Sequence, residues 1–430
     1  MRLSFFKNTL LITVLVLISC VNRSNSNSKD GEVEIVADVI RDRPHIVEGA
    51  ARFDQYLPTL SSKKVGVVSN QTSIVFNESF IYEFDGFNGS DSLFAVKRDF
   101  THLVDTLLSQ KVDIRKVFAP EHGFRGRADA GELVKDGMDT KTGLPIISLY
   151  GKNKKPSESQ MEGLDVVVFD IQDVGVRFYT YVSTMHYMME ACAEAGIPFI
   201  VLDRPNPNGH YIDGPIMEKK HTSFLGLHPV PLVHGMTIGE YAKMINGESW
   251  LANGMKCDLT VIEMENYSHE TFYSVPVRPS PNLPNDVAIN LYPSLGLLEG
   301  TNLNAGRGTE MQFQTFGSPH LPIEYYPFQY TPQPNFGAKY PKHKGTQCNG
   351  LDLRETPRMS RLDLTWIIEA YKNHSDKENF FNTKNFTAHA GTEVLQQQIM
   401  QGYTHKDIRN TWIKPLMEYD AMRQRYLLYK

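Results

Sequence analysis

The stretch KVFAPEHGFRGRADAGE, residues 116–132, places the acid Glu121 directly after an apolar, strand-like run. Two glycines follow within five positions, and glycine permits close approach of backbone or ligand. A carboxyl group held at a strand end beside apolar side chains is suited to donate a proton near neutral pH. The stretch therefore predicts a general acid at Glu121. The structural alternative is an ion pair with Arg125 or Arg127 that holds the loop.

A second stretch, LLEGTNLNAGRGTE at residues 297–310, carries two further acids, Glu299 and Glu310. Its three glycines leave backbone N–H groups open to a ligand. Arg307 lies between the two acids, and a guanidinium binds a carboxylate or another anion through two parallel hydrogen bonds. The structural alternative is a tight loop held by an ion pair between Arg307 and Glu310.

Carboxylates from different strands that face one polar site are the arrangement of glycosidases. One acid protonates the leaving oxygen, and the other acts as a nucleophile or positions water. Their separation is roughly 5 to 5.5 Å in retaining and about 6.5 to 9.5 Å in inverting enzymes. The sequence does not give this distance, so the stereochemistry stays open. Tyrosines such as Tyr179 suit the faces of sugar rings by stacking.

The elements that position these residues alternate between short β-branched runs and stretches with helical periodicity. Near-continuous apolar strands separated by helices predict an α/β fold with a doubly wound parallel sheet covered on both faces. The expected strands are 65–69, 115–119, 145–150, 165–171, 198–203 and 257–264.

Polar residues follow four of these strands. In a parallel sheet the ligand site lies beyond the carboxyl ends of the strands, and right-handed crossovers bring those ends to one edge. Any one polar residue is explained as a turn or cap residue, but four such strand ends in succession favour a shared pocket. Besides Glu121, the candidates are Asn70, His122, Asp170, Asp173, Arg177, Asp203 and Arg204.

The proline-punctuated run VPVRPSPNLPND, residues 275–286, interrupts this alternation and indicates a domain crossing. The chain beyond it is first glycine-rich, then aromatic and proline-rich, and finally helical. We therefore predict a catalytic domain over residues 51–275. A smaller α+β domain over residues 276–430 is expected to complete a cleft between the two.

The N terminus, MRLSFFKNTLLITVLVLISC, has two basic residues before a short apolar run. This run is about half the ~20 residues of a spanning helix, and the pattern is that of an export signal. The LISC ending resembles the lipobox of bacterial lipoproteins, which implies acylation of Cys20. We expect a signal peptide over residues 1–19 and a polar tether over 20–50. The protein would be exported and anchored to a membrane, facing the periplasm or the cell surface.

Charge and missing motifs exclude several classes of function. Lys and Arg number 44 against 49 Asp and Glu, and removing Arg2 and Lys7 with the signal leaves 42 minus 49, or −7. An acidic exported protein is not expected to bind nucleic acid. The sequence has no G-x-G-x-x-G after a strand, no P-loop, no H-E-x-x-H, no C-x-x-C and no G-x-S-x-G. We expect no cofactor, no metal and no disulfide framework.

Six motifs, GVVSNQTS, FAPEHGFRG, DIQDVGVRFYTYVSTM, LDRPNPNG, GLLEGTNLNAGRGTE and FGSP, together resemble the NamZ-type exo-β-N-acetylmuramidases, a bacterial family. The similarity covers about Arg52 to the C terminus. It implies a Rossmann-like N-terminal domain, a smaller C-terminal domain and an active site between them. It also implies release of non-reducing terminal N-acetylmuramic acid from peptidoglycan fragments. The family's leading catalytic glutamate maps onto Glu121, with Glu310 first and Glu299 second as its partner.

The residues fit that substrate. Its lactyl carboxylate suits Arg307, Arg125 or Arg177, and its acetamide suits Asn70 or Asn302. An acetamide also permits a substrate-assisted route, so three mechanisms stay open. A non-catalytic lipoprotein that binds peptidoglycan fragments for uptake or sensing is the alternative from another class. An exported dehydrogenase is disfavoured by the missing phosphate-binding motif.

Overall fold

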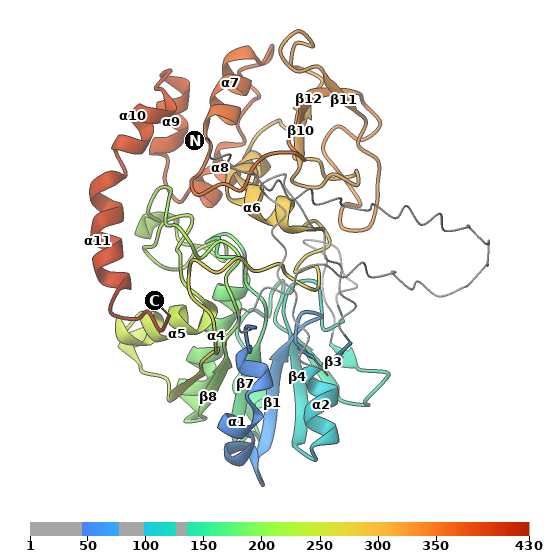
Figure 1. The fold of residues 1–430 in the computed structure, drawn as a ribbon, viewed down its shortest axis with the longest axis vertical. Helices are drawn as coiled ribbons and strands as arrows, with labels where there is room; N and C mark the ends of the chain where they lie inside the picture. The colour runs from blue at the N-terminus through green and yellow to red at the C-terminus, as the bar shows by residue number, and fades with distance from the viewer. Residues whose placement is uncertain (1–44, 77–98, 126–135, 430) are drawn as a thin grey trace, which may run out of the picture.

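The computed structural model describes residues 45–76, 99–125 and 136–429, and a seven-stranded sheet forms the lower half of the molecule in Figure 1. The strand order is β5-β6-β4-β1-β7-β8-β9. All neighbouring pairs are parallel except β5 with β6. The strands are β1 (Lys64–Ser69), β4 (Asp113–Ala119), β5 (Gly137–Met138), β6 (Pro145–Ser148), β7 (Val166–Asp170), β8 (Phe199–Leu202) and β9 (Leu259–Ile262). Six of them occupy the runs expected from the sequence, which confirms the parallel α/β class.

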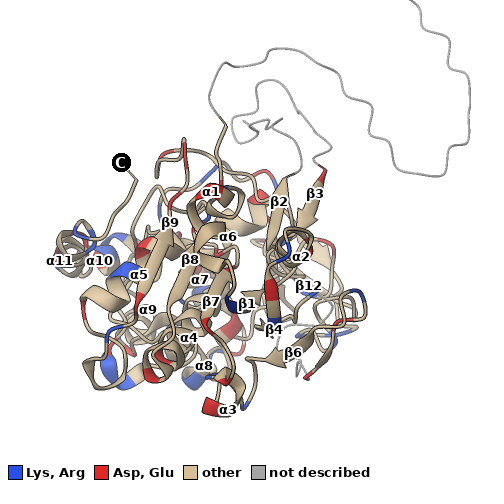
Figure 2. Cartoon of the chain, turned by 90° about the horizontal axis from the view of Figure 1, so that it is seen from below, with Lys and Arg blue, Asp and Glu red and all other residues tan. Residues whose placement is uncertain are grey.

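Both faces of this sheet are covered, which explains its continuous apolar strands. Val65 and Val67 pack with α1 (Phe53–Leu60) and α2 (Leu103–Ser109), whereas Val68 packs with α4 (Tyr181–Ala195) and α5 (Ile238–Gly247) on the other face. This alternation follows the two-residue period of a strand. Figure 2 shows charged residues on outer helices such as α3 (Glu158–Met161), while the interior strand β8 carries none. The short strands β2 (Ile74–Phe76) and β3 (Phe100–His102) pair antiparallel with each other and form a separate two-stranded sheet.

The C-terminal part is a smaller α+β unit, as expected. Its antiparallel sheet has the order β10-β12-β11. The elements are α6 (Asp286–Leu295), the 3-10 helix η4 (Gly296–Gly300), β10 (Thr315–Ser318), β11 (Phe328–Tyr330), β12 (Cys348–Asp352), α7 (Thr365–Asn373), α8 (Thr383–Ala390), α9 (Val394–Met400), α10 (His405–Asn410) and α11 (Ile413–Arg423).

One continuous core joins the two parts. A single cluster of buried apolar side chains includes Phe169 of β7, Leu297 of η4 and Phe386 of α8. Helix α11 then runs back along the side of the molecule towards the sheet (Figure 1). The two parts are therefore held together by apolar packing, and the domain boundary at 275/276 stays a prediction.

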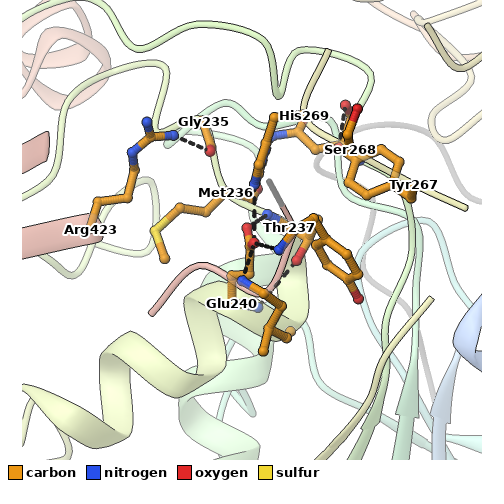
Figure 3. Close-up of polar contacts among 12 residues, drawn as sticks. Gly235, Met236, Thr237, Glu240, Tyr267, Ser268, His269 and Arg423 are labelled. Atoms are coloured by element: carbon orange, nitrogen blue, oxygen red, sulfur yellow. Dashed lines mark hydrogen bonds and ion pairs between the residues drawn. The ribbon is translucent and has the colours of Figure 1, made fainter. Parts of the chain in front are cut away.

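The end of the chain returns to the first part. Arg423 donates to the Gly235 carbonyl, and His269 hydrogen-bonds to Glu240 at 3.0 Å (Figure 3). Glu240 also accepts the backbone N–H of Leu428 at 2.8 Å. These contacts fasten the C-terminal segment onto the N-terminal end of α5.

The expected signal peptide, Cys20 and most of the expected tether lie outside the described residues. The last residues of the predicted 20–50 tether are packed. Ile46 is buried, Val47 forms a bridge with Glu265, and Gly49 donates its N–H to the Asp203 carbonyl.

Candidate active site

Glu121 lies in a tight turn two residues beyond the end of β4. The next two residues have positive φ angles, 71° at His122 and 77° at Gly123. The Thr180 hydroxyl donates to Glu121 Oε2 at 2.9 Å, and the Tyr150 hydroxyl lies close enough to Glu121 for its charge to act on it. Burial and then the charge of Glu121 raise the pKa of Tyr150. The acid is thus half-buried, bonded to the Thr180 hydroxyl and near the Tyr150 hydroxyl.

The strand order brings the predicted pocket residues to one edge. Tyr150 follows β6, Glu121 follows β4, Asn70 follows β1 and Asp173 lies in the loop after β7. These four strands are consecutive neighbours in the sheet and run parallel. Their carboxyl ends therefore lie side by side at the edge where α/β proteins bind ligands.

A cluster of tyrosines lies at the same edge, where the C-terminal part meets the sheet. The rings of Tyr179 and Tyr181 meet edge to face at 4.7 Å, and Tyr179 lies 6.0 Å from Tyr292 of α6. Burial raises the pKa of Tyr292, and the charges of Glu299 and Glu121 raise it further. Both carboxylates are therefore close enough to act on one hydroxyl.

Glu299 and Arg307 form an ion pair within the second stretch, with 3.4 Å between Oε2 and Nη1. Burial disfavours the charged carboxylate, but the charges of Arg307 and Lys342 outweigh it and lower the pKa of Glu299. Lys342 donates to three backbone carbonyls of the same loop. Arg307 therefore pairs with Glu299, while Glu310, the partner in the structural alternative, is exposed.

The other two candidate arginines have structural partners. Arg125 donates to Asp139 at 2.8 Å and to Asp105 at 3.4 Å. Arg125 thereby ties the Glu121 loop to these two carboxylates. Burial lowers the pKa of Arg125, but the hydrogen bonds and charges of Asp139 and Asp105 outweigh burial, and the pKa rises. The buried Arg177 donates through Nη1 to two carbonyls near the sheet and through Nη2 to two carbonyls at the end of α8. Arg307, with a quarter of its side chain exposed, is the more accessible cation.

Three further candidates lie beneath the edge. Asp170 and Arg204 form a buried ion pair with hydrogen bonds of 2.5 and 2.9 Å. Asp203 accepts hydrogen bonds from the Gly239 N–H and the Tyr429 hydroxyl. These contacts hold strands, α5 and the C terminus together.

The two remaining candidates differ in their surroundings. Asn302 accepts hydrogen bonds from Ser318 at 2.7 Å and from His374 at 3.1 Å, within the C-terminal part. His122 is buried in the Glu121 turn.

Sequence reasoning missed Thr180, which binds Glu121, and Tyr150, which lies beside it. Tyr150 ends the predicted strand 145–150, so the strand-end rule that selected Asn70 also applied to it. Thr180 lies 59 residues from Glu121, and no local pattern connects the two.

The described residues show no group of three or more His, Cys, Asp or Glu side chains placed to hold a metal ion. Cys192, Cys257 and Cys348 are free, buried thiols, and burial raises the pKa of each. Within the described ranges, none of the helices has both the length and the apolar character needed to cross a membrane.

Comparison with known proteins gives consistent matches. Residues 65–287 match the family described as exo-beta-N-acetylmuramidase NamZ, N-terminal, and residues 290–429 match its C-terminal counterpart. The peptidoglycan beta-N-acetylmuramidase NamZ of Bacillus subtilis is 40% identical over 76% of this chain and 84% of its own. Crystal structures of two DUF1343 family proteins from Bacteroides fragilis superpose with TM-scores of 0.78 and 0.73. Their identities are 39% and 28%, and the matches cover 90% of this chain in each case and 99% and 100% of theirs.

Proposed function

The chain belongs to the NamZ family of exo-β-N-acetylmuramidases, and we propose that Glu121 is the general acid with which it releases N-acetylmuramic acid. The resemblance drawn from the six motifs is thereby confirmed, and the protein is a glycoside hydrolase of peptidoglycan. Its substrate is a glycan or muropeptide fragment with N-acetylmuramic acid at the non-reducing end.

The observation that carries the role of Glu121 is its fixed position at the sheet edge. A general acid must hold its proton at one point, where the leaving oxygen arrives. Thr180, at the start of α4, binds this carboxyl group, and Tyr150, which follows β6, lies beside it. Tyr179 and Tyr181 pack edge to face at this edge, next to Tyr292, but both are buried and their hydroxyls donate to the Pro279 carbonyl. The stacking on a sugar that the sequence predicted for Tyr179 is therefore not supported by its position.

Arg307 is the best placed of the three candidate arginines for the lactyl carboxylate. Arg307 is partly exposed and forms an ion pair with Glu299. Burial raises the pKa of Tyr292, and the charges of Glu299 and Glu121 both raise it further, which places the Arg307 loop near Glu121. Arg307 is held by Glu299 at 3.4 Å and by the Gly337 carbonyl at 3.2 Å, whereas Arg125 and Arg177 make shorter bonds of 2.8 and 2.7 Å to their partners. The lactyl group distinguishes muramic acid from glucosamine, so this contact would set the choice of sugar.

The test uses a chromogenic β-muramide and a peptidoglycan-derived disaccharide with purified protein. Wild-type protein should release N-acetylmuramic acid, which mass spectrometry identifies. Glu121→Gln should lower kcat by roughly 10²–10⁴-fold, the usual contribution of general acid catalysis, with a small change in KM. The exposed Glu158→Gln in α3 serves as the matched control with full activity. Full activity of the folded Glu121→Gln variant would remove Glu121 from the chemistry. An unchanged disaccharide with wild-type protein would support the binding lipoprotein instead.

The N-terminal sequence supports an exported, lipid-anchored location. The apolar run and the LISC ending supply the signal, and Cys20 would carry the acyl chains. Mass spectrometry of the protein made in a bacterial host should find a lipid on Cys20. A Cys20→Ser variant should leave the membrane fraction. An unmodified Cys20 in mature, membrane-bound protein would contradict the proposal.

A further inference from the structure

Several buried polar atoms near the sheet edge have no hydrogen-bond partner among the described residues, and they include Asn70 Nδ2 and Asp173 Oδ1. Asn70 is fully buried, and Asp173 is 5% exposed. A buried polar group without a partner costs roughly 1–3 kcal/mol, so it calls for an explanation such as a missing ligand. One atom is a donor and the other an acceptor, so a single bound group could satisfy both.

The orientation of Asn70 is set by Thr72. Its Oδ1 accepts the backbone N–H of Thr72 at 2.9 Å and the Thr72 hydroxyl at 2.6 Å. Because a backbone N–H only donates, the oxygen of the amide must face Thr72. Nδ2 is therefore the atom directed to the other side, where it presents N–H donors.

Asp173 is oriented by two groups on its other oxygen. The Gly175 N–H donates to Oδ2 at 2.7 Å, and His234 Nε2 lies 3.7 Å from the same atom. The backbone N–H of Met236 donates to His234 Nδ1, so the hydrogen of the neutral ring sits on Nε2 and faces Asp173. The hydrogen bond from Gly175 orients the carboxyl group and leaves Oδ1 for another donor, while His234 Nε2 lies beyond hydrogen-bond distance.

The hydroxyl of Tyr181 shows that both atoms belong to the site of Glu121. Burial raises the pKa of Tyr181, the charges of Glu121 and Asp173 raise it further, and the Asn70 amide lowers it. The Asn70 amide is thus near this hydroxyl, although Nδ2 falls short of hydrogen-bond geometry. Glu121, Asn70 and Asp173 follow β4, β1 and β7, which are consecutive neighbours in the sheet, so the three residues lie along one stretch of its edge.

We propose that Asp173 and Asn70 bind the 2-acetamido group of muramic acid and that this acetamide is the nucleophile of the reaction. The N–H of the acetamide donates to Asp173 Oδ1, and its carbonyl oxygen accepts from Asn70 Nδ2. This inference rests on the proposed function. The other acid near Tyr292, Glu299, is engaged by Arg307, which favours the substrate's own carbonyl over a protein nucleophile.

The proposed reaction has two balanced steps. The acetamide oxygen forms a bond to C1 while the bond from C1 to the leaving oxygen breaks, and Glu121 gives its proton to that oxygen. Asp173 stabilises the positive charge on the resulting oxazolinium ring through the N–H hydrogen bond. Water then attacks C1, Glu121 takes its proton, and the acetamide oxygen leaves C1. One water is consumed, and N-acetylmuramic acid is released with retained configuration.

The first experiment uses only the wild-type enzyme. Chromogenic β-muramides with zero, one, two or three fluorines on the acetyl methyl group are compared under the same conditions. Fluorine withdraws electrons from the carbonyl oxygen, so kcat/KM should fall with each fluorine added. Equal rates across the series would overturn the inference while leaving the proposed hydrolase intact. No release of N-acetylmuramic acid from the parent substrate would instead contradict the proposed function.

The second experiment tests Asp173 itself. Asp173→Asn should lower kcat by roughly 10²–10³-fold, as for loss of other groups that stabilise transition-state charge. It should also weaken inhibition by a muramic-acid thiazoline, which mimics the cyclised acetamide. Asp363→Asn is the matched control, because Asp363 likewise accepts the N–H two residues ahead, at 2.7 Å, but lies in the C-terminal part. A folded Asp173→Asn variant with wild-type kcat and thiazoline affinity would refute the assignment.

Discussion

The hydroxyl of Thr180 donates its hydrogen to Glu121 Oε2 at 2.9 Å rather than capping the helix that it begins. Thr180 is the N-cap residue of α4, a position where threonine normally accepts a helical N–H. In the described structure its side chain makes no such capping bond. The start of α4, which carries a partial positive charge, thereby binds the carboxyl group of Glu121 from the turn after β4.

Replacing Thr180 should affect catalysis more than stability. Thr180→Val keeps the shape of the side chain but removes the donor to Glu121. A hydrogen bond to a charged group contributes about 1.5–3 kcal/mol, so kcat should fall roughly 10- to 100-fold. The midpoint of thermal unfolding should change little, because no capping bond is lost. Thr365→Val, which removes a hydroxyl donor to Asp363, is the control with normal kcat. A normal kcat in Thr180→Val would show that Glu121 needs no such support.

Arg307 should determine the preference for muramic acid. Arg307→Met removes the charge but keeps much of the chain's bulk. We expect kcat/KM for a β-muramide to fall about 100-fold, in line with loss of a buried charge-assisted contact. The value for the matching N-acetylglucosaminide, which lacks the lactyl carboxylate, should hardly change. The exposed Arg354→Met is the control. An equal loss on both substrates would indicate a structural role only.

Arg177 should matter for stability. Its guanidinium satisfies four backbone carbonyls from both parts of the chain, and a lysine offers fewer donors in a different geometry. Unsatisfied buried carbonyls cost about 1–3 kcal/mol each, so Arg177→Lys should lower the free energy of unfolding by roughly 3 kcal/mol. Urea unfolding measures this. Arg115→Lys, at an exposed ion pair with Asp113, should leave stability unchanged. Equal stability of the two variants would mean that apolar packing alone joins the parts.

Asp203 should make stability depend on pH. Burial, and then the charge of Glu240, raises the pKa of Asp203 from its ordinary value near 3.8 to about 7. Between pH 4 and 7 the folded protein keeps a proton that the unfolded chain has lost. The contribution of Asp203 is therefore fully present below pH 4 and is lost as pH rises to 7, on the order of 4 kcal/mol in all.

The measurement is the free energy of unfolding in urea at pH 5 and pH 7.5. Asp203→Asn should lose less stability than wild type between these two values, because asparagine does not titrate. Asp54→Asn, at an exposed position in α1, should keep the wild-type pH dependence. If Asp203→Asn kept it as well, Asp203 would not be the titrating group.

The sequence by itself determined the strands of the large sheet and the position of Glu121 beyond one of them. Both are local properties: runs such as VVVFD and FIVL are apolar throughout because the strands are buried on both faces. The six motifs also identified the family, since they are contiguous stretches. The strand-end rule selected Asn70 and Asp173 for the same reason.

The tertiary structure decided which of the polar side chains are available to a substrate. Arg125, Arg177 and Arg307 look alike in sequence, and all three have partners in the structure. Arg125 and Arg177 make shorter bonds, to Asp139, 14 residues away, and to the Ala390 carbonyl, 213 residues away, whereas the contacts of Arg307 are 3.2 and 3.4 Å long. Glu121 likewise meets Thr180 because β4, β1 and β7 are neighbours in the sheet. Strand order and long-range hydrogen bonds arise from the packing of the whole chain, and no local periodicity encodes them.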